Sequence, residues 1–145
     1  MKIIIEELHE GEEEEIIIRS NNIDESILQM IYGVKMEHKK IVGNKDGKMT
    51  LIDPKDIYYF ESVDNKTFIY CMKEVYESKL KLYEIDEQFK NSSFFRAAKS
   101  TILNLSKIKN ISPAFNGRFE ANLKNNEKVI ISRQFVPELK RKLGL

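Results

Sequence analysis

Short runs of β-branched and aromatic residues, separated by turn-forming residues, recur along the chain between positions 48 and 132. Apolar residues alternate with polar ones in these runs, as in strands that bury one face. The predicted strands are "KMTLI" (48–52), "DIYYFES" (56–62), "KTFIYCM" (66–72), "STILN" (100–104), "KIKNI" (107–111), "RFEANL" (118–123) and "KVIIS" (128–132). So many short strands predict a mainly β, α+β fold built from antiparallel sheets.

Two segments of this body have helical spacing instead. Residues 79–90 place their apolar side chains on one face, with Ser78 as the expected N-cap. Residues 137–143, "PELKRKL", begin with a proline, which suits a first helical turn. In this last helix we expect Leu139 and Leu143 to point inward.

The first 43 residues have a different pattern. Residues 2–8 and 14–19 each contain three consecutive isoleucines, and the "HEGEE" between them favours a hairpin of two strands. Residues 23–34 have the periodicity of a short amphipathic helix, with Asn22 as the expected N-cap.

The turn sequence "GNKDGK" (43–48) separates this region from the β body. A chain of 145 residues with 41% apolar content can form one domain with a small addition. We therefore predict an appendage of residues 1–43, suited to dimerisation or partner docking, and a β domain of residues 44–145. The alternative is that the isoleucine strands extend the sheet of the β domain.

Charge is distributed unevenly along the chain although the formal net charge is only +1. Residues 1–15 contain seven acids, whereas residues 96–145 contain eleven Lys or Arg and three acids. A basic surface of this kind suits a polyanion, because Lys and Arg that neutralise phosphates release condensed counterions. The alternative is an ordinary solvated lysine-rich surface.

Several classes of protein are disfavoured by what the sequence lacks. It contains no P-loop, no GxSxG and no paired His or Cys set with metal-ligand spacing, so we expect neither catalysis nor a cofactor. The single cysteine, Cys71, lies in an apolar run and suits a buried site in a reducing cytoplasm. No apolar stretch is long enough to span a membrane.

Three predicted loops carry side chains suited to phosphates and base edges. They hold Asn65, Lys66 and Thr67 in "SVDNKT", Arg96 and Lys99 in "FFRAAKS", and Arg133 and Gln134 in "ISRQF". Each residue taken singly is more often an ordinary polar loop residue, but the same chemistry recurs in all three loops.

The order of these segments resembles a LytTR DNA-binding domain over roughly residues 44–143. The resemblance rests on "DIYYFESVDNKTFIYC", the Phe94 to Ser100 run, Asn104, the hairpin from Phe115 and "SR" at 132–133. It implies stacked small antiparallel sheets whose loops enter successive major grooves of a bent duplex. It places the base contacts at Lys66 and Thr67, at Lys99 and at Arg133. Ala98 departs from the family, which often has histidine there. Lys99 stands where the family often has asparagine or arginine, which keeps a donor, and the preferred bases are expected to differ.

The resemblance implies a sequence-specific transcriptional regulator that binds double-stranded DNA. The expected DNA-binding residues are Asn65, Lys66, Thr67, Arg96, Lys99, Arg118, Arg133, Gln134 and Lys140. We also expect Lys140, Arg141 and Lys142 to lie near phosphates, and the acidic appendage to lie on the opposite side.

Two copies are expected on paired DNA repeats, with a regulatory protein as a further possible partner. The 47 residues before the β body are too few for a receiver domain, so we expect the regulator to act without one. The alternative function is a protein-interaction module on the same fold that does not bind DNA.

Overall fold

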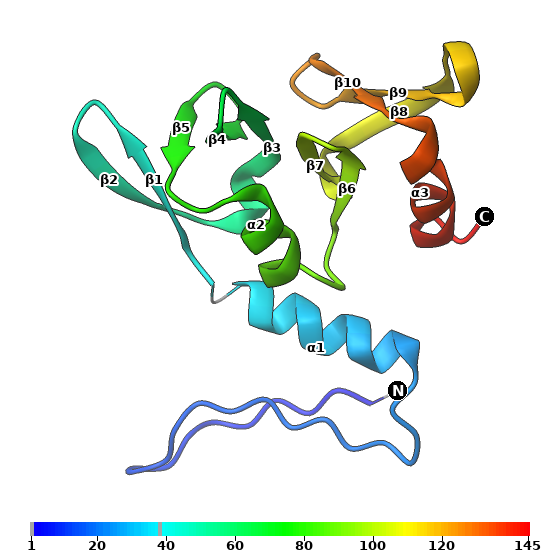
Figure 1. The fold of residues 1–145 in the computed structure, drawn as a ribbon. Coiled ribbons are helices and arrows are strands. Elements are labelled where there is room, and N and C mark those ends of the chain that lie inside the picture. The colour runs from blue at the N-terminus through cyan, green and yellow to red at the C-terminus, as the bar shows by residue number, and fades with distance from the viewer. Residues whose placement is uncertain (1, 38) are drawn as a thin grey trace.

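The computed structural model describes residues 2–37 and 39–145. Figure 1 shows two β-sheets side by side, with short helices around them and an extended N-terminal segment. In chain order the elements are α1 (Glu25–Glu37), β1 (Ile41–Lys45), β2 (Lys48–Ile52), the 3-10 turn η1 (Pro54–Asp56), β3 (Ile57–Val63), β4 (Lys66–Cys71), β5 (Val75–Ser78), α2 (Leu82–Gln88), β6 (Phe94–Ala98), β7 (Thr101–Asn104), η2 (Leu105–Lys107), β8 (Ile108–Pro113), η3 (Phe115–Gly117), β9 (Phe119–Leu123), β10 (Lys128–Ile131), η4 (Arg133–Phe135) and α3 (Val136–Lys142). The predicted mainly antiparallel β body, with one internal helix and a C-terminal helix, is confirmed.

The larger sheet has seven strands in the order β2-β1-β5-β4-β3-β7-β6, and the smaller sheet has the order β10-β9-β8. All strand pairs are antiparallel. Seven strands correspond to the seven predicted runs, with small differences at their ends. Three strands, β1, β5 and β6, were not predicted.

In sequence, these missed strands lack the alternation of apolar and polar residues that predicts a half-buried strand. In β6, Phe94 and Phe95 are both buried, because each face of the strand meets a different hydrophobic core. In β1, Gly43 was predicted to belong to a turn. A Cβ at this position would lie 2.6 Å from atoms of both Ile52 and Tyr76. The glycine therefore permits close packing inside a strand. The predicted domain boundary near residue 43 falls within β1.

The two cores lie on opposite faces of the larger sheet. Phe60 of β3 and Ile69 of β4 pack with Phe89, at the end of α2, in the first core. The second core joins the sheet to β9, β10 and α3, and includes Leu103 and Leu139. Burying each such side chain contributes about 1.5–3 kcal/mol, so these two cores fix the positions of the strand ends.

The helix ends differ from the predicted caps. In α1 the cap is Asp24, whose carboxylate accepts a hydrogen bond from the Ile27 N–H at 3.0 Å, whereas Asn22 lies in a bend before the helix. Ser78 belongs to β5, and α2 begins after Lys81, whose N–H donates to the Glu84 side chain. At the start of each helix, a carboxylate, of Asp24 or of Glu84, accepts a backbone N–H where another side chain was predicted to cap.

The predicted hairpin of residues 2–8 and 14–19 is wrong. A turn forms, with the Glu12 N–H donating to the His9 carbonyl at 3.1 Å, but the two arms carry no strand hydrogen-bond ladder. Continuing that register would place Glu6 opposite Glu15 and Glu7 opposite Glu14. Like charges directly opposite each other disfavour strand pairing, and an isolated two-stranded hairpin is only marginally stable.

Candidate nucleic-acid interface

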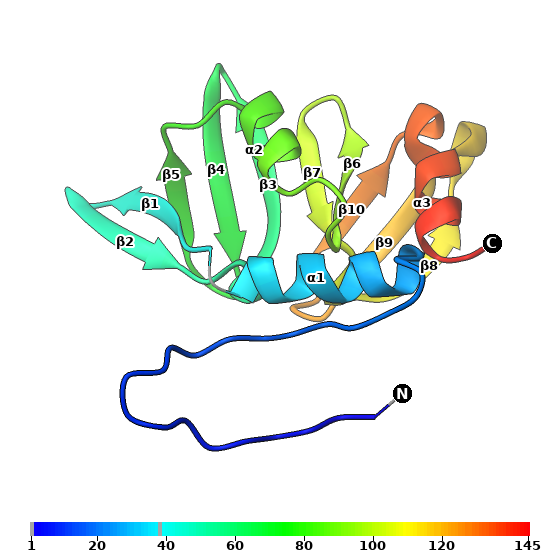
Figure 2. The same ribbon diagram turned by 90° about the horizontal axis from the view of Figure 1, so that it is seen from below.

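Three strand ends meet at one edge of the β body. The Ser62 N–H at the end of β3 donates to the Ser100 carbonyl in the β6–β7 turn at 2.8 Å. The Ser132 N–H after β10 donates to the Ala97 carbonyl of β6, also at 2.8 Å. Figure 2 shows the β3–β4 turn, the β6–β7 turn and the exit of β10 along one side, opposite α1 and the N-terminal segment. We call residues 64–66, 98–100, 115–118 and 133–134 the turn edge.

The β3–β4 turn presents two of the predicted residues to solvent. Asn65 and Asp64 have φ of 63° and 51°, the left-handed conformation of a tight two-residue hairpin turn, which asparagine tolerates well. Asn65 and Lys66 are exposed. Thr67, by contrast, is only 4% exposed within β4, so its predicted contact with bases is not supported. Alternation along β4 places the side chains of Lys66 and Thr67 on opposite faces of the strand.

Arg96 is not a loop residue as predicted, but lies half-buried in β6. Its guanidinium donates to the Ala98 carbonyl at 3.0 Å and the Lys99 carbonyl at 2.7 Å, and lies 3.4 Å from the Asp86 carboxylate of α2. These contacts occupy most of its donors and hold the β6–β7 turn. Lys99 is exposed at that turn. Arg96 therefore positions Lys99 rather than projecting from the surface.

Arg133 and Gln134 lie exposed in η4, immediately after β10. The side chain of Arg133 passes close to η3, because a Cβ on Gly117 would lie 2.9 Å from its Cδ. Gly117 also has φ of 74°, so glycine is required there twice over. Arg118 follows directly and is exposed, which brings both arginines to neighbouring parts of the turn edge.

The basic residues of α3 are not equivalent. Lys140 is exposed, with its ammonium 6.0 Å from the centre of the Phe119 ring at the start of β9. Arg141 donates two hydrogen bonds to Glu138, and Lys142 donates to the Ser92 carbonyl at 2.9 Å. Burial lowers the pKa of Lys142. Only Lys140 of these three thus remains suited to an external phosphate.

Leu143, predicted to point inward, is 46% exposed, whereas Leu139 is buried as expected. α3 ends at Lys142, and Leu143 caps the helix instead of continuing its buried face. The inward face of this helix is made by Val136 and Leu139.

The basic residues at the turn edge differ from those within the fold in their ion pairs. Within the described residues, no ion pair involves Lys66, Lys99 or Arg133. Their donors are available to phosphate oxygens and to acceptors on base edges. The exposed amides of Asn65 and Gln134 add donors and acceptors to the same edge.

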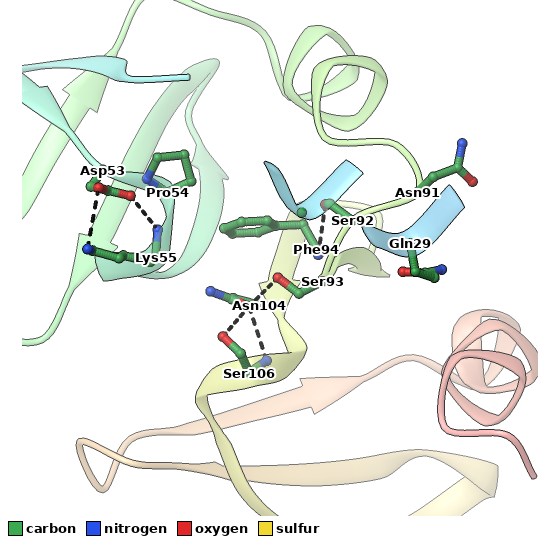
Figure 3. A pocket seen from close by; sticks show the side chains of 11 residues that line it. Gln29, Asp53, Pro54, Lys55, Asn91, Ser92, Ser93, Phe94, Asn104 and Ser106 are labelled. Carbon is green, nitrogen blue, oxygen red and sulfur yellow. Dashed lines mark hydrogen bonds and ion pairs between the residues drawn. The ribbon is translucent and has the colours of Figure 1, made fainter. Parts of the chain in front are cut away.

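A cleft of about 310 Å³ lies elsewhere, between α1, η1 and the segment that enters β6 (Figure 3). Asn104 lines it, but its amide donates to the Ile57 carbonyl, and its oxygen accepts from Ser93 and from the N–H and hydroxyl of Ser106. Asn104 therefore joins three segments of the fold. This structural role accounts for the asparagine at this position, and no ligand is needed to explain it.

The single cysteine, Cys71, is a partly buried free thiol. Burial, with the negative charges of Asp56 and Glu74, raises the pKa of Cys71 to about 11, which leaves a neutral and weakly reactive thiol. Among the side chains that the structure describes, no group of three or more His, Cys, Asp or Glu is placed to hold a metal ion. None of the helices in residues 2–37 and 39–145 is long and apolar enough to cross a bilayer.

Comparison with known proteins identifies related sequences and a related fold. Residues 47–144 match the family profile of the LytTr DNA-binding domain. The Sensory transduction protein LytT of Enterococcus faecalis is 34% identical over 113 residues, which are 78% of this chain and 46% of that protein. The Transcriptional regulatory protein YpdB of Escherichia coli K12 is 33% identical over 102 residues, 70% of this chain and 42% of YpdB. The chain thus spans less than half the length of these relatives.

A solved LytTr DNA-binding domain from Bacillus cereus superposes with a TM-score of 0.69. The two are 24% identical, and the match covers 73% of this chain and 97% of that domain. The arrangement of sheets and helices is therefore shared.

Proposed function

The chain belongs to the LytTr DNA-binding domain family, and from that premise we propose that it is a sequence-specific transcriptional regulator whose turn edge reads double-stranded DNA. It acts by binding and not by catalysis. The observation that carries the proposal is the convergence of Lys66, Lys99 and Arg133, from three distant parts of the sequence, on one exposed edge.

Each residue has a proposed role that follows from its chemistry. The Arg133 guanidinium suits bidentate pairing with guanine O6 and N7 in the major groove. Lys66, Lys99 and Asn65 lie on neighbouring turns and suit further base or phosphate contacts. Lys140, to one side on α3, suits a phosphate. Thr67 is buried and Arg96 donates to the backbone, so neither is proposed as a direct DNA contact. Arg118 and Gln134 are proposed as flanking contacts.

The test is Arg133→Ala on a duplex selected from a random pool and on a scrambled duplex. Loss of the guanine contact is expected to cost about 1–3 kcal/mol on the selected duplex and little on the scrambled one. Fluorescence anisotropy measures both affinities, and thermal unfolding shows whether the fold is intact. An unchanged ratio of the two affinities would show that Arg133 does not read bases.

Lys140→Ala tests the phosphate contact separately. It is expected to weaken all sequences alike and to lower the slope of log affinity against log salt by about one. Lys124→Ala is the matched control, because Lys124 is exposed at the β9–β10 turn, at the opposite end of the strands from Arg133. A non-binding interaction module on the same fold would show no salt-dependent binding of any duplex.

Two copies are proposed to bind DNA together, because one domain of this size covers only about one helical turn. Stoichiometry on a duplex with two repeats measures this, and one copy bound at saturation would contradict it. We expect the function in the cytoplasm. Action without a receiver domain and control by a protein partner stay predictions.

A further inference from the structure

The run of isoleucines at residues 16–18 is extended and solvent-exposed. Ile16, Ile17 and Ile18 are 67%, 60% and 37% exposed, although β-branched residues at this density are typical of paired strands. The run has neither a strand partner nor a place in either hydrophobic core of the described residues. An unpaired strand-like segment of this kind is a template for another strand.

Charge disfavours the first arm of the same chain as that partner. In the register set by the turn at His9 and Glu12, Ile16 would meet Ile5, but Glu15 would meet Glu6 and Arg19 would meet Lys2. Every charged pair in this arrangement joins like charges, which is unfavourable at directly opposed positions.

The same run is complementary to itself. In an antiparallel pair of two copies centred on Ile17, Ile16 lies opposite the second copy's Ile18, and Glu15 lies opposite the second copy's Arg19. Glu14 lies opposite Ser20, so no like charges are opposed. Because side chains alternate between faces, the two copies together place four isoleucine side chains on one face.

We propose that residues 15–19 form a self-association strand that pairs antiparallel with the same residues of a second copy of this chain. Such an interface is two-fold symmetric, with Glu15 of each copy meeting Arg19 of the other. The segment lies on the opposite side of the molecule from the turn edge, so two joined copies both keep that edge exposed (Figure 2).

The interface goes beyond the proposed function, because it requires no DNA. A single pair of short strands is weak by itself, so we expect association only at high protein concentration. On a duplex with two repeats, two bound copies raise each other's effective concentration, and the same strands then contribute cooperativity.

The test measures self-association of the full 145-residue chain, without DNA, by sedimentation velocity over a series of protein concentrations. In a pair of identical copies, Glu15→Arg places an arginine opposite Arg19 at both ends of the pair. Arg19→Glu likewise places a glutamate opposite Glu15 at both ends. Each variant alone is expected to lose at least about tenfold in self-association affinity relative to the parent chain. A one-to-one mixture of the two variants restores both opposite-charge pairs and is expected to regain association.

Glu13→Arg is the matched control, since it makes the same charge change opposite the neutral Asn21 and is expected to leave association intact. A parent chain that stays monomeric, single variants that associate normally, or a mixture that fails to recover would overturn the proposal. An effect of Glu13→Arg as large as that of Glu15→Arg would also overturn it. Binding to a duplex with one site, measured on the same variants, reports the proposed function separately.

Discussion

The β3–β4 hairpin and the segment of residues 2–20 have similar local sequences, yet only one is paired. In the hairpin, Phe60 lies opposite Ile69 and Ser62 lies opposite Thr67, around a two-residue turn. Phe60 and Ile69 are fully buried, whereas Ile17 of the N-terminal segment is 60% exposed. Both regions have β-branched residues and a turn, so these features alone do not decide pairing.

The difference lies in what each region packs against. Two neighbouring strands flank the β3–β4 pair, and α2 covers its apolar face, so the entropy lost on ordering is offset by burial. The N-terminal arms have no such layer, and their charges oppose pairing within the chain. Within a single chain, these two regions thus form paired strands only where a further element supplies burial.

The largest expected effect separates the two regions by stability. Ile69→Ala is expected to lower the free energy of unfolding by about 2–5 kcal/mol, because it leaves a cavity in a closely packed core. Ile17→Ala is expected to change it by less than about 0.5 kcal/mol, as at exposed sites. Urea unfolding of both variants at low protein concentration measures this, and comparable losses would mean that the N-terminal segment packs on the body.

A second prediction concerns the turns. The β6–β7 turn, unlike that of the N-terminal segment, is held by a half-buried guanidinium, that of Arg96 in β6. Arg96→Ala is expected to cost about 1–3 kcal/mol of stability, because it removes charged hydrogen bonds to two carbonyls. Lys99→Ala, in the same turn, should lower DNA affinity with stability unchanged. Equal stability of the two variants would contradict the positioning role of Arg96.

A third prediction compares two turn glycines. Gly117 and Gly11 have φ of 74° and 88°, so alanine is strained at both, but only Gly117 has a neighbour, Arg133, within 4 Å of an added Cβ. Gly117→Ala is expected to displace the Arg133 side chain and lose part of the ~1–3 kcal/mol of its base contact. Gly11→Ala should leave affinity for a one-site duplex unchanged. Fluorescence anisotropy on such a duplex compares the two variants. Equal losses of affinity would count against a base contact by Arg133.

The smallest effect is in the pH dependence of stability, and it concerns a charge pair that supports the body. The Lys40 ammonium, at 2.7 Å, and then the Lys55 N–H hold the pKa of Asp53 below its ordinary value. The lower pKa in the folded state means that this stabilisation is present above about pH 4 and is lost as pH falls through the folded pKa. Asp53→Asn should flatten that part of the curve of unfolding free energy against pH. An unchanged slope would exclude Asp53 as its source.

Local sequence determined most of the fold. Alternating apolar residues predicted seven of the ten strands, and the turn chemistry of "VDNK" predicted the β3–β4 hairpin, because period and turn residues act over a few positions. The chemistry of three loops and the family resemblance predicted Lys66, Lys99 and Arg133 as DNA contacts. These signals depend on neighbouring residues and are visible in the chain.

Only the tertiary structure decided which of these features pair and which remain exposed. It buried Thr67, gave the guanidinium of Arg96 to the backbone of its own turn and left the isoleucines of residues 16–18 in solvent. It also made a strand of the glycine-containing β1. The physical reason is that burial and hydrogen-bond partners come from residues far apart in sequence, so runs with similar strand propensity reach different outcomes according to what the fold places beside them.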